Sequence, residues 1–181
     1  MQLSRQKLCR GSAACPCRGM KNTSRFADIE AARTAVNLAL PFIEKTLERP
    51  GVSARKVLHV VVLDPAATCD CSNFEEALLY EHSVGDRHNW DADYAAFARD
   101  KARLSWRHQM GSRHLIHMEP HRLSLSDTLL WGSVWLDGIV VAASGAMPAW
   151  DEAFSLCVAG NLRAIALERS TGMPIAKSQD D

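Results

Sequence analysis

The chain has 181 residues, of which 47% are hydrophobic, and this is enough for one domain with a substantial core that depends on neither disulfides nor metals. Lysine and arginine together number 21, as do aspartate and glutamate, so the formal net charge is zero and gives no reason to expect a nucleic-acid or membrane partner. No apolar run approaches the roughly 18–20 residues that span a bilayer, so the sequence predicts no transmembrane helix.

The start of the chain is basic and rich in cysteine. It lacks the apolar stretch of a secretory signal, so we expect residues 1–23 to be a flexible extension, with an organellar address as the alternative, and the protein to be cytoplasmic. Residues 173–181 are expected to be a disordered tail. In a protein that is not exported the cysteines are expected to be thiols, and their two Cys-x-Cys pairs have a shorter spacing than structural zinc sites use. The pairs are Cys15-Pro-Cys17 and Cys69-Asp-Cys71, and the six basic residues before the first acidic one are Arg5, Lys7, Arg10, Arg18, Lys21 and Arg25.

The first predicted elements are a helix and a buried strand. Residues 24–49 carry apolar side chains at intervals of three, four and seven, which predicts an amphipathic helix. Pro41 removes one helical hydrogen bond, so we expect a kink or a break into two helices near residues 37–40. Residues 57–63 form a nearly continuous β-branched and apolar run, which predicts a central strand covered on both faces.

The middle of the chain predicts a second strand and a second helix. Residues 76–83 are predicted to be a strand, although Leu78-Leu79 also suits a helix. Asp91 is a suitable N-cap for a helix that ends at Gly111. The side chains expected to point inward from this helix are Tyr94, Phe97, Ala98, Ala102 and Trp106.

A β-hairpin and a final helix complete the predicted domain. Residues 129–136 and 139–143 are apolar runs on either side of Asp137-Gly138, a dipeptide favoured where both residues of a two-residue turn have positive φ. The last helix is expected to begin at Asp151, as its N-cap, and to continue to about residue 169.

The predicted order is therefore α-β-β-α-β-β-α. This order favours an α/β domain of the α+β type over residues 24–172, with a single mostly antiparallel sheet flanked by helices. The sequence contains neither the glycine-rich dinucleotide motif nor the phosphate loop, which disfavours a Rossmann fold.

Histidines are concentrated in one short segment. His108, His114, His117 and His121 fall within 14 residues, and imidazole is the commonest protein ligand of iron, zinc and copper. His114, His117 and His121 would share a face if the segment were helical, but Pro120 argues against a helix and favours a long loop. These three residues are the candidate ligands of haem iron or another metal. Solvent-facing or hydrogen-bonded histidines are the alternative.

Two further features suit an anionic ligand. Arg99, Arg103 and Arg107, spaced by four, form a basic stripe that can contact haem propionates or can simply be a solvated helix face. Ser144-Gly145 follows the last predicted strand and precedes a helix start, where backbone N–H groups favour an anion. The predicted cofactor-binding residues are therefore His114, His117, His121, Arg103, Arg107, Ser144 and Gly145.

The order of several segments resembles the GlcG/HbpS-like haem-binding family, whose domain is also seen at the C-terminus of PduO-type proteins. The similar segments are residues 57–64, Ala-Arg-Asp-Lys-Ala-Arg at 98–103, Asp-Gly-Ile-Val-Val-Ala-Ala-Ser-Gly at 137–145 and Asp-Glu-Ala at 151–153, within roughly residues 25–170. The chain departs from the family in having Asp64-Pro-Ala-Ala67 where Asp-Ala-Gly-Gly is usual, and in its histidine-rich insert. The resemblance implies a small α/β domain that binds haem and assembles into a homo-oligomer.

Three functions follow as hypotheses. The first is a small-ligand-binding protein, with haem as the ligand. The second is an enzyme acting on a small carboxylic acid, with His117 as general base and the helix start at Asp151 as a carboxylate or oxyanion cradle. The third is a structural or regulatory oligomer without a ligand.

Overall fold

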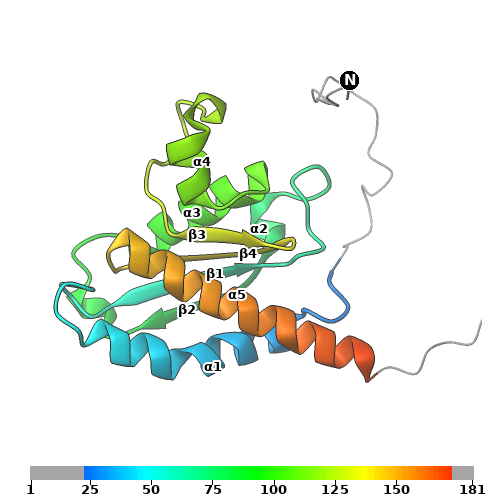
Figure 1. The fold of residues 1–181 in the computed structure, drawn as a ribbon, viewed down its shortest axis with the longest axis horizontal. Helices are drawn as coiled ribbons and strands as arrows, with labels where there is room; N and C mark the ends of the chain where they lie inside the picture. The colour runs from blue at the N-terminus through cyan, green and yellow to red at the C-terminus, as the bar shows by residue number, and fades with distance from the viewer. Residues whose placement is uncertain (1–22, 173–181) are drawn as a thin grey trace, which may run out of the picture.

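The computed structural model describes residues 23–172, which form a four-stranded antiparallel sheet with helices on both faces (Figure 1). The predicted α+β fold with a single antiparallel sheet is confirmed. Within the described residues, none of the helices combines the length and apolar character needed to cross a membrane. The predicted extension, with Cys9, Cys15 and Cys17, and the predicted tail lie outside the described residues.

The sheet is built around its first strand. Strands β1 (Leu58–Leu63), β2 (Leu78–Val84), β3 (Ser133–Leu136) and β4 (Ile139–Ser144) lie in the order β2-β1-β4-β3, and every neighbouring pair is antiparallel. All six residues of β1 are buried, as its apolar composition predicts for a central strand. Strand β2 lies at the edge, so one of its sides is not paired.

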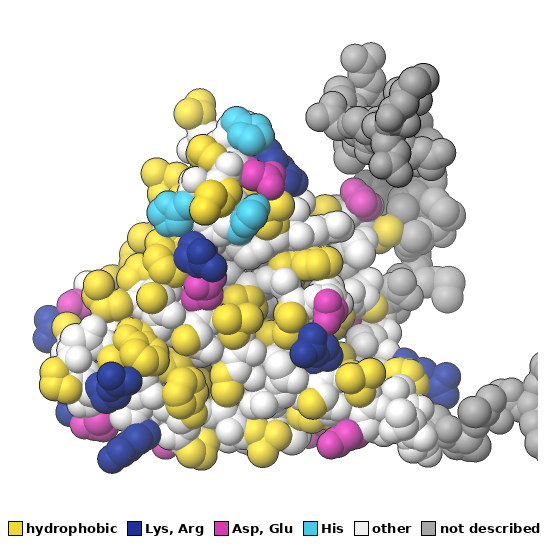
Figure 2. Space-filling model, viewed as in Figure 1, with side chains coloured by type: hydrophobic (Ala, Val, Ile, Leu, Met, Phe, Trp, Pro, Cys, Tyr) yellow, Lys and Arg dark blue, Asp and Glu magenta, His cyan; other side chains and the backbone are white. Residues whose placement is uncertain are grey.

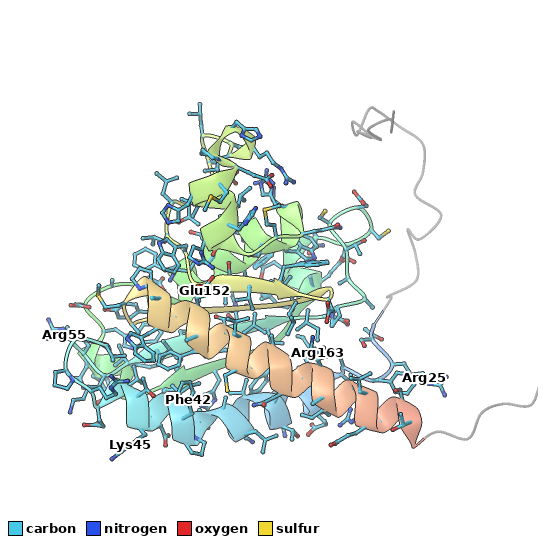
Figure 3. The ribbon with its side chains drawn as sticks, viewed as in Figure 1. Arg25, Phe42, Lys45, Arg55, Glu152 and Arg163 are labelled. Carbon is cyan, nitrogen blue, oxygen red and sulfur yellow. The ribbon has the colours of Figure 1, made fainter. Side chains whose placement is uncertain are left out.

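Two long helices cover one face of the sheet. Helices α1 (Ile29–Leu47) and α5 (Pro148–Thr171) lie side by side across it (Figure 1), and alternate residues of β1 and β4 pack against them. Phe42 of α1 meets Phe154 of α5 edge to face, with ring centroids 5.7 Å apart (Figure 3). This helix pair forms the larger of the two hydrophobic clusters.

A third helix covers the opposite face. Helix α3 (Tyr94–His108) packs Ala98, Ala102 and Trp106 against the other residues of β1 and β4, together with the short helix α2 (Phe74–Ala77). The Trp106 indole donates a 2.6 Å hydrogen bond to the Ala67 carbonyl, which joins α3 to the segment after β1. The predicted inward positions Tyr94 and Phe97 are only partly buried.

Helix α1 differs from its prediction at two points. It begins at Ile29 because Asp28 is the N-cap and accepts a hydrogen bond from the Ala31 N–H at 2.9 Å. It continues through Pro41, so the predicted break into two helices is wrong. The face that carries Ala35, Val36, Ala39 and Ile43 is fully buried, and this packing outweighs the one hydrogen bond that proline removes.

The middle of the chain contains more helix than predicted. Residues 76 and 77 end helix α2, which an Asn73–Glu76 capping box begins, so strand β2 starts at Leu78. Asp93, and not Asp91, caps α3, and a left-handed Gln109 ends this helix before Gly111. The loop predicted around the histidines instead contains helix α4 (Ser112–Met118), and the 3₁₀ turn η2 (Pro120–Arg122) follows it. A second 3₁₀ turn, η1 (Arg87–Asn89), precedes α3. Pro120 ends α4 but does not prevent it, because its steric effect reaches only the preceding residue.

The hairpin is confirmed and the predicted cap of α5 is wrong. Asp137 and Gly138 both have positive φ in the two-residue turn between β3 and β4, although β3 starts four residues later than residue 129. Met147 is the N-cap of α5 and Pro148 its first residue, so Asp151 lies inside the first turn. There its carboxylate accepts a hydrogen bond from the Ala146 N–H at 3.0 Å.

A test of the fold is the glycine between β4 and α5. Gly145 has φ +137°, and a Cβ there would lie 2.3 Å from the Val57 carbonyl oxygen. We therefore expect Gly145→Ala to lower the free energy of unfolding, measured in urea, by more than about 3 kcal/mol, because backbone strain of about 1–3 kcal/mol adds to the cost of the clash. Gly51→Ala is the control, because Gly51 has φ +81° but no atom within 4 Å, and should show only the strain. Equal losses in the two variants would contradict the close approach.

Candidate functional site

The structure does not bring the three predicted histidine ligands together as a metal site within the described residues. His114 and His117 lie on helix α4 and His121 lies in η2, all with exposed side chains. Figure 2 shows histidine side chains on the surface over the α4 region. His114 Nε2 is 3.4 Å from a Glu119 carboxylate oxygen, and His117 packs edge to face on Trp131 at 5.9 Å between centroids. Among residues 23–172, no group of three or more histidine, cysteine or acidic side chains is placed to hold a metal ion.

The predicted arginines are held by their own neighbours. Arg103 pairs with Asp100 at 2.8 Å, and its guanidinium lies 4.2 Å from the centroid of the Phe74 ring. Arg107 pairs with the largely buried Asp127 at 2.6 Å. The basic stripe on α3 is therefore neutralised locally at both positions.

Ser144 lies beside a buried ion pair. Lys101 of α3 and Asp151 of α5 are 3% and 1% exposed, and their charged atoms are 2.7 Å apart. The Lys101 ammonium also donates to the Ala143 carbonyl at 3.0 Å and to the Ser144 hydroxyl at 3.2 Å. Burial raises the pKa of Asp151 to about 6, against the opposing influence of Lys101, so this carboxylate is ionised at neutral pH.

This ion pair closes off the predicted anion-binding site at the start of α5, because backbone N–H groups there already have partners. The Asp151 carboxylate takes the Ala146 N–H, and the Met147 N–H bonds to the Val52 carbonyl at 2.8 Å. Ser144 is buried, and the backbone of Gly145 lies against Val57. The N-terminus of α5 therefore already has partners within the chain.

The predicted cofactor-binding residues lie on separate elements and do not all line one site. The histidines are on α4 and η2, the two arginines are paired with carboxylates, and Ser144 is sealed against Lys101. A porphyrin needs an apolar wall close to an iron ligand. These residues do not supply one in common.

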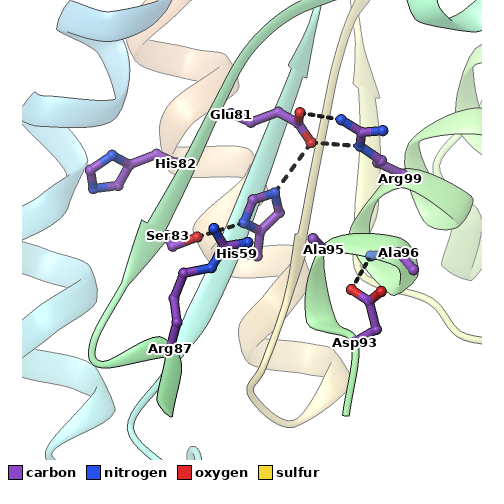
Figure 4. A pocket seen from close by; sticks show the side chains of 9 residues that line it. All are labelled: His59, Glu81, His82, Ser83, Arg87, Asp93, Ala95, Ala96 and Arg99. Atoms are coloured by element: carbon purple, nitrogen blue, oxygen red, sulfur yellow. Dashed lines mark hydrogen bonds and ion pairs between the residues drawn. The ribbon is translucent and has the colours of Figure 1, made fainter. Parts of the chain in front are cut away.

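A polar pocket lies elsewhere, between strands β1 and β2 and the start of α3 (Figure 4). Its volume is about 510 Å³. Strand β2 forms its outer wall, and Ala95 and Ala96 in the first turn of α3 form the facing wall. The lining residues are His59, Glu81, His82, Ser83, Arg87, Asp93, Ala95, Ala96 and Arg99.

Four of these side chains form one hydrogen-bonded chain (Figure 4). His59 Nδ1 is 2.9 Å from the Ser83 hydroxyl, and His59 Nε2 is 3.2 Å from a Glu81 carboxylate oxygen. Arg99 donates to both oxygens of Glu81, at 2.8 and 2.6 Å. The bidentate geometry fixes the carboxylate, which in turn fixes the imidazole.

The pairing of β1 with β2 builds this chain. His59 lies directly opposite Ser83, and Glu81 is two residues from Ser83, so all three side chains project from the face that α3 covers. His82 lies between them in sequence, and its ring points away from His59 towards the α1 side. His59 is only 5% exposed, so its two ring nitrogens need partners within the protein.

Burial and charge set the protonation states. Desolvation lowers the pKa of His59 below its usual value, which keeps the imidazole neutral at neutral pH. The hydrogen bonds from Arg99 lower the pKa of Glu81, which keeps the carboxylate ionised. An ionised Glu81 accepts a hydrogen bond from the Nε2–H of His59, and Nδ1 is then left to accept a hydrogen bond from the Ser83 hydroxyl.

Arg87 completes the pocket. Its guanidinium lies 4.7 Å from the centroid of the Trp90 ring, and it is close enough to His59 to contribute to lowering the pKa of that residue. Among the described residues no carboxylate forms an ion pair with Arg87. The other lining carboxylate, Asp93, accepts the Ala96 N–H at 2.9 Å as the cap of α3.

Only one member of this hydrogen-bonded chain, Arg99, is among the residues that the sequence singles out. Arg99 was predicted only as part of the basic stripe. His59 is the one polar residue in the apolar run of residues 57–63, and a polar residue in a strand covered on both faces has to have a partner. The alternation of Glu81 and Ser83 on the next predicted strand was the second available signal.

Comparisons with models of known protein families, with curated proteins and with solved structures find no match to this chain.

The buried ion pair predicts a pH-dependent loss of stability when its cation is removed. In Lys101→Met the pKa of Asp151 rises further above about 6, because Lys101 lowers it in the native chain. The folded state then holds a proton that the unfolded chain, with a pKa near 3.8, releases, so stability is lost as pH rises through this interval. We expect a loss of about 3–5 kcal/mol at pH 8 and a smaller loss at pH 5 in urea unfolding.

Lys56→Met is the matched control for this prediction. Lys56 pairs with Glu48 at the same 2.7 Å, but both side chains are more than half exposed, so its removal should cost less than about 1 kcal/mol at either pH. A Lys101→Met variant whose loss is the same at pH 5 and pH 8 would show that Asp151 does not titrate in this range.

Proposed function

We propose that this protein binds a small polar organic ligand with a carboxylate group, in the pocket between β1, β2 and α3. The observation that carries the proposal is Arg87, a cation on the pocket wall without an ion-pair partner among the described residues. A volume of about 510 Å³ is within the range of pockets that hold small molecules, roughly 300–1,000 Å³.

The charges of the lining support an anionic ligand. Glu81 is balanced by Arg99, and Asp93 is balanced by the first turn of α3, whose N–H groups carry partial positive charge. Arg87 is an exposed residue and has no ion-pair partner among the described residues, so its guanidinium is available to pair with a ligand carboxylate. Ser83 and His59 are neutral hydrogen-bonding groups on the same wall, which suits a second polar group on the ligand.

The proposal keeps the small-ligand-binding function predicted from sequence and changes the ligand. The lining contains two alanine side chains and otherwise polar or charged residues, which is unfavourable for a porphyrin face. The proposed pocket also supplies a different histidine, His59, from the three that the sequence predicted.

Haem binding at α4 remains a second candidate. Helix α4 exposes His114 and His117, and Met118 beside them is 66% exposed, so an imidazole and an apolar surface do occur together there (Figure 2). Leu129 and Leu130, in the segment that leads to β3, are also exposed.

We also propose that the protein forms a homo-oligomer. The exposed apolar residues near α4 and on the outer sides of α1 and α5 support an interface between copies. Sedimentation velocity of the full chain measures the oligomeric state, and a monomer at all concentrations would exclude the proposed homo-oligomer. The exposed residues are Met118, Leu125, Leu129 and Leu130 near α4, Ile29, Leu38 and Phe42 on α1, and Leu156 and Leu167 on α5.

The test of the proposed function is carboxylate binding. Acetate, lactate, succinate and benzoate are screened by thermal shift, each beside its uncharged amide, and the best is measured by titration calorimetry. Arg87→Gln should weaken carboxylate binding about tenfold or more, because a hydrogen bond to a charged group contributes about 1.5–3 kcal/mol. Arg33→Gln, which removes an exposed charge on α1, should leave the affinity unchanged. Equal binding of amide and carboxylate, or an Arg87→Gln variant with native affinity, would exclude the proposal.

Haem is tested by haemin titration. We expect that, if α4 holds the iron, a saturable Soret band appears and is lost in one of His114→Ala, His117→Ala and His121→Ala, since a coordinated imidazole is needed for it. The three side chains are exposed, so none of these substitutions should lower the unfolding midpoint by more than a few degrees. A response that does not saturate, or that is the same in all three variants, removes the haem candidate.

A further inference from the structure

We infer that the pocket is also a hydrolytic site, in which Ser83 is the nucleophile, His59 its general base and Glu81 the residue that orients the base, and in which a small carboxylic ester is the substrate. The inference rests on the proposed function, because the carboxylate that the pocket is proposed to bind is the product of this reaction.

The distances are those of an activated nucleophile. The Ser83 hydroxyl is 2.9 Å from His59 Nδ1, and Glu81 is 3.2 Å from Nε2, both at the reach of a hydrogen bond between nucleophile, base and orienting carboxylate. The two ring nitrogens have the opposite roles from those in chymotrypsin-like enzymes. Such a constellation is defined by its geometry and by the role of each group, and not by which nitrogen is used.

The arrangement is also rigid and accessible. His59 and Ser83 are fixed by the β1–β2 register, and Arg99 holds Glu81 through two hydrogen bonds. Ser83 is partly exposed on an edge strand and lines the pocket, so a substrate can reach its hydroxyl. The burial of His59 by itself accounts for a partner at each ring nitrogen, but it does not require that the Ser83 partner line an open pocket.

The protonation states suit the first step. With Glu81 ionised, the His59 proton is on Nε2, and the unprotonated Nδ1 faces the Ser83 hydroxyl. The lowered pKa of His59 means that the base is neutral, and so able to accept a proton, at neutral pH.

The reaction balances with water as the only co-substrate. Ser83 Oγ forms a bond to the ester carbonyl carbon and gives its proton to His59 Nδ1, and the leaving alcohol takes that proton as its C–O bond breaks. Water then attacks the acyl-serine and gives a proton to Nδ1, which returns it to Ser83 Oγ as the acyl–oxygen bond breaks. The net change is ester plus water to carboxylic acid plus alcohol, and the acid ionises in solution.

Positive charge is available for the tetrahedral intermediate. Arg87 lies on the same wall and close to His59, and the first turn of α3 presents Ala95 and Ala96 to the pocket. A cation such as the Arg87 guanidinium stabilises the negative oxygen that develops during attack, whereas the Ala96 N–H is already bonded to the Asp93 carboxylate. Arg87 is therefore the residue that would contact first the oxyanion and then the product carboxylate.

The experiment is acylation of the full chain by 4-nitrophenyl acetate. Native protein, quenched in acid after a short pulse, should carry an acetyl group on the peptide that contains Ser83, and Ser83→Ala should lose it. Ser126→Ala, which removes an exposed serine far from the pocket in sequence, should retain it. The native acylation rate should rise as His59 loses its proton, with a midpoint below pH 6.5.

Two further variants separate catalysis from packing. His59→Gln should be acylated at least about 100-fold more slowly than the native protein, because a general base usually contributes a factor of this size. Because His59 is buried, Glu81→Gln is measured beside it, and should slow acylation at least about tenfold and move the midpoint to lower pH, since Glu81 raises the pKa of His59. A structural role would not move the midpoint.

The outcomes distinguish the two proposals. If the native chain binds a carboxylate but carries no acetyl group on Ser83, the hydrolytic inference is wrong and the binding function stands. Acylation of Ser83 at the same rate in His59→Gln and Glu81→Gln also excludes it. If the chain neither binds a carboxylate nor acylates, both proposals fall.

Discussion

Strand β1 is hydrogen-bonded to an antiparallel neighbour on each side and covered by helices on both faces, so any polar side chain on it has to find a partner inside the protein. His59 is that side chain. The strand registers place Ser83 opposite it on β2 and Ser144 opposite it on β4, so a row of polar residues crosses three strands on the face covered by α3. An imidazole left without partners there would cost about 1–3 kcal/mol, and this cost explains why polar residues gather at this level of the sheet.

The two ends of the polar row differ in how they are covered. At the β4 end, Ser144 is sealed by Lys101 and Asp151, and Gly132 allows close packing because a Cβ there would lie 2.5 Å from Asp151. At the β2 end the sheet stops, and the side chains face a pocket. The polar residues on the β4 side of β1 are therefore enclosed by the protein, whereas those on the β2 side can contact a ligand in the pocket.

The pocket and the helix α4 surface support different functions that can be tested separately. The pocket is polar, small and lined by Arg87 and His59, which favours a carboxylate or an ester. Helix α4 has exposed histidines and apolar residues, which favour haem or contact with another copy. The contacts and charges of the described residues carry the first of these proposals.

Local signals in the sequence account for most of the fold. Asp137-Gly138 fixes the hairpin, and the apolar run of β1 fixes its central position, because turn chemistry and burial act over a few residues. Pro41 shows the limit of such signals. A single lost hydrogen bond predicted a break, and the buried face of α1 overrode it.

The site depended on information that the sequence does not carry locally. Asp151 has the pattern of a helix cap, yet its partner is Lys101, 50 positions earlier in the chain. His59 and Glu81 are 22 positions apart, and only the β1–β2 register brings them within a hydrogen bond. The sequence by itself determined the three long helices, the four strands and their apolar faces, because these follow from local spacing, but not the short helices α2 and α4. Only the tertiary structure decided which polar side chains meet, because strand register and helix packing set distances between residues far apart in the chain.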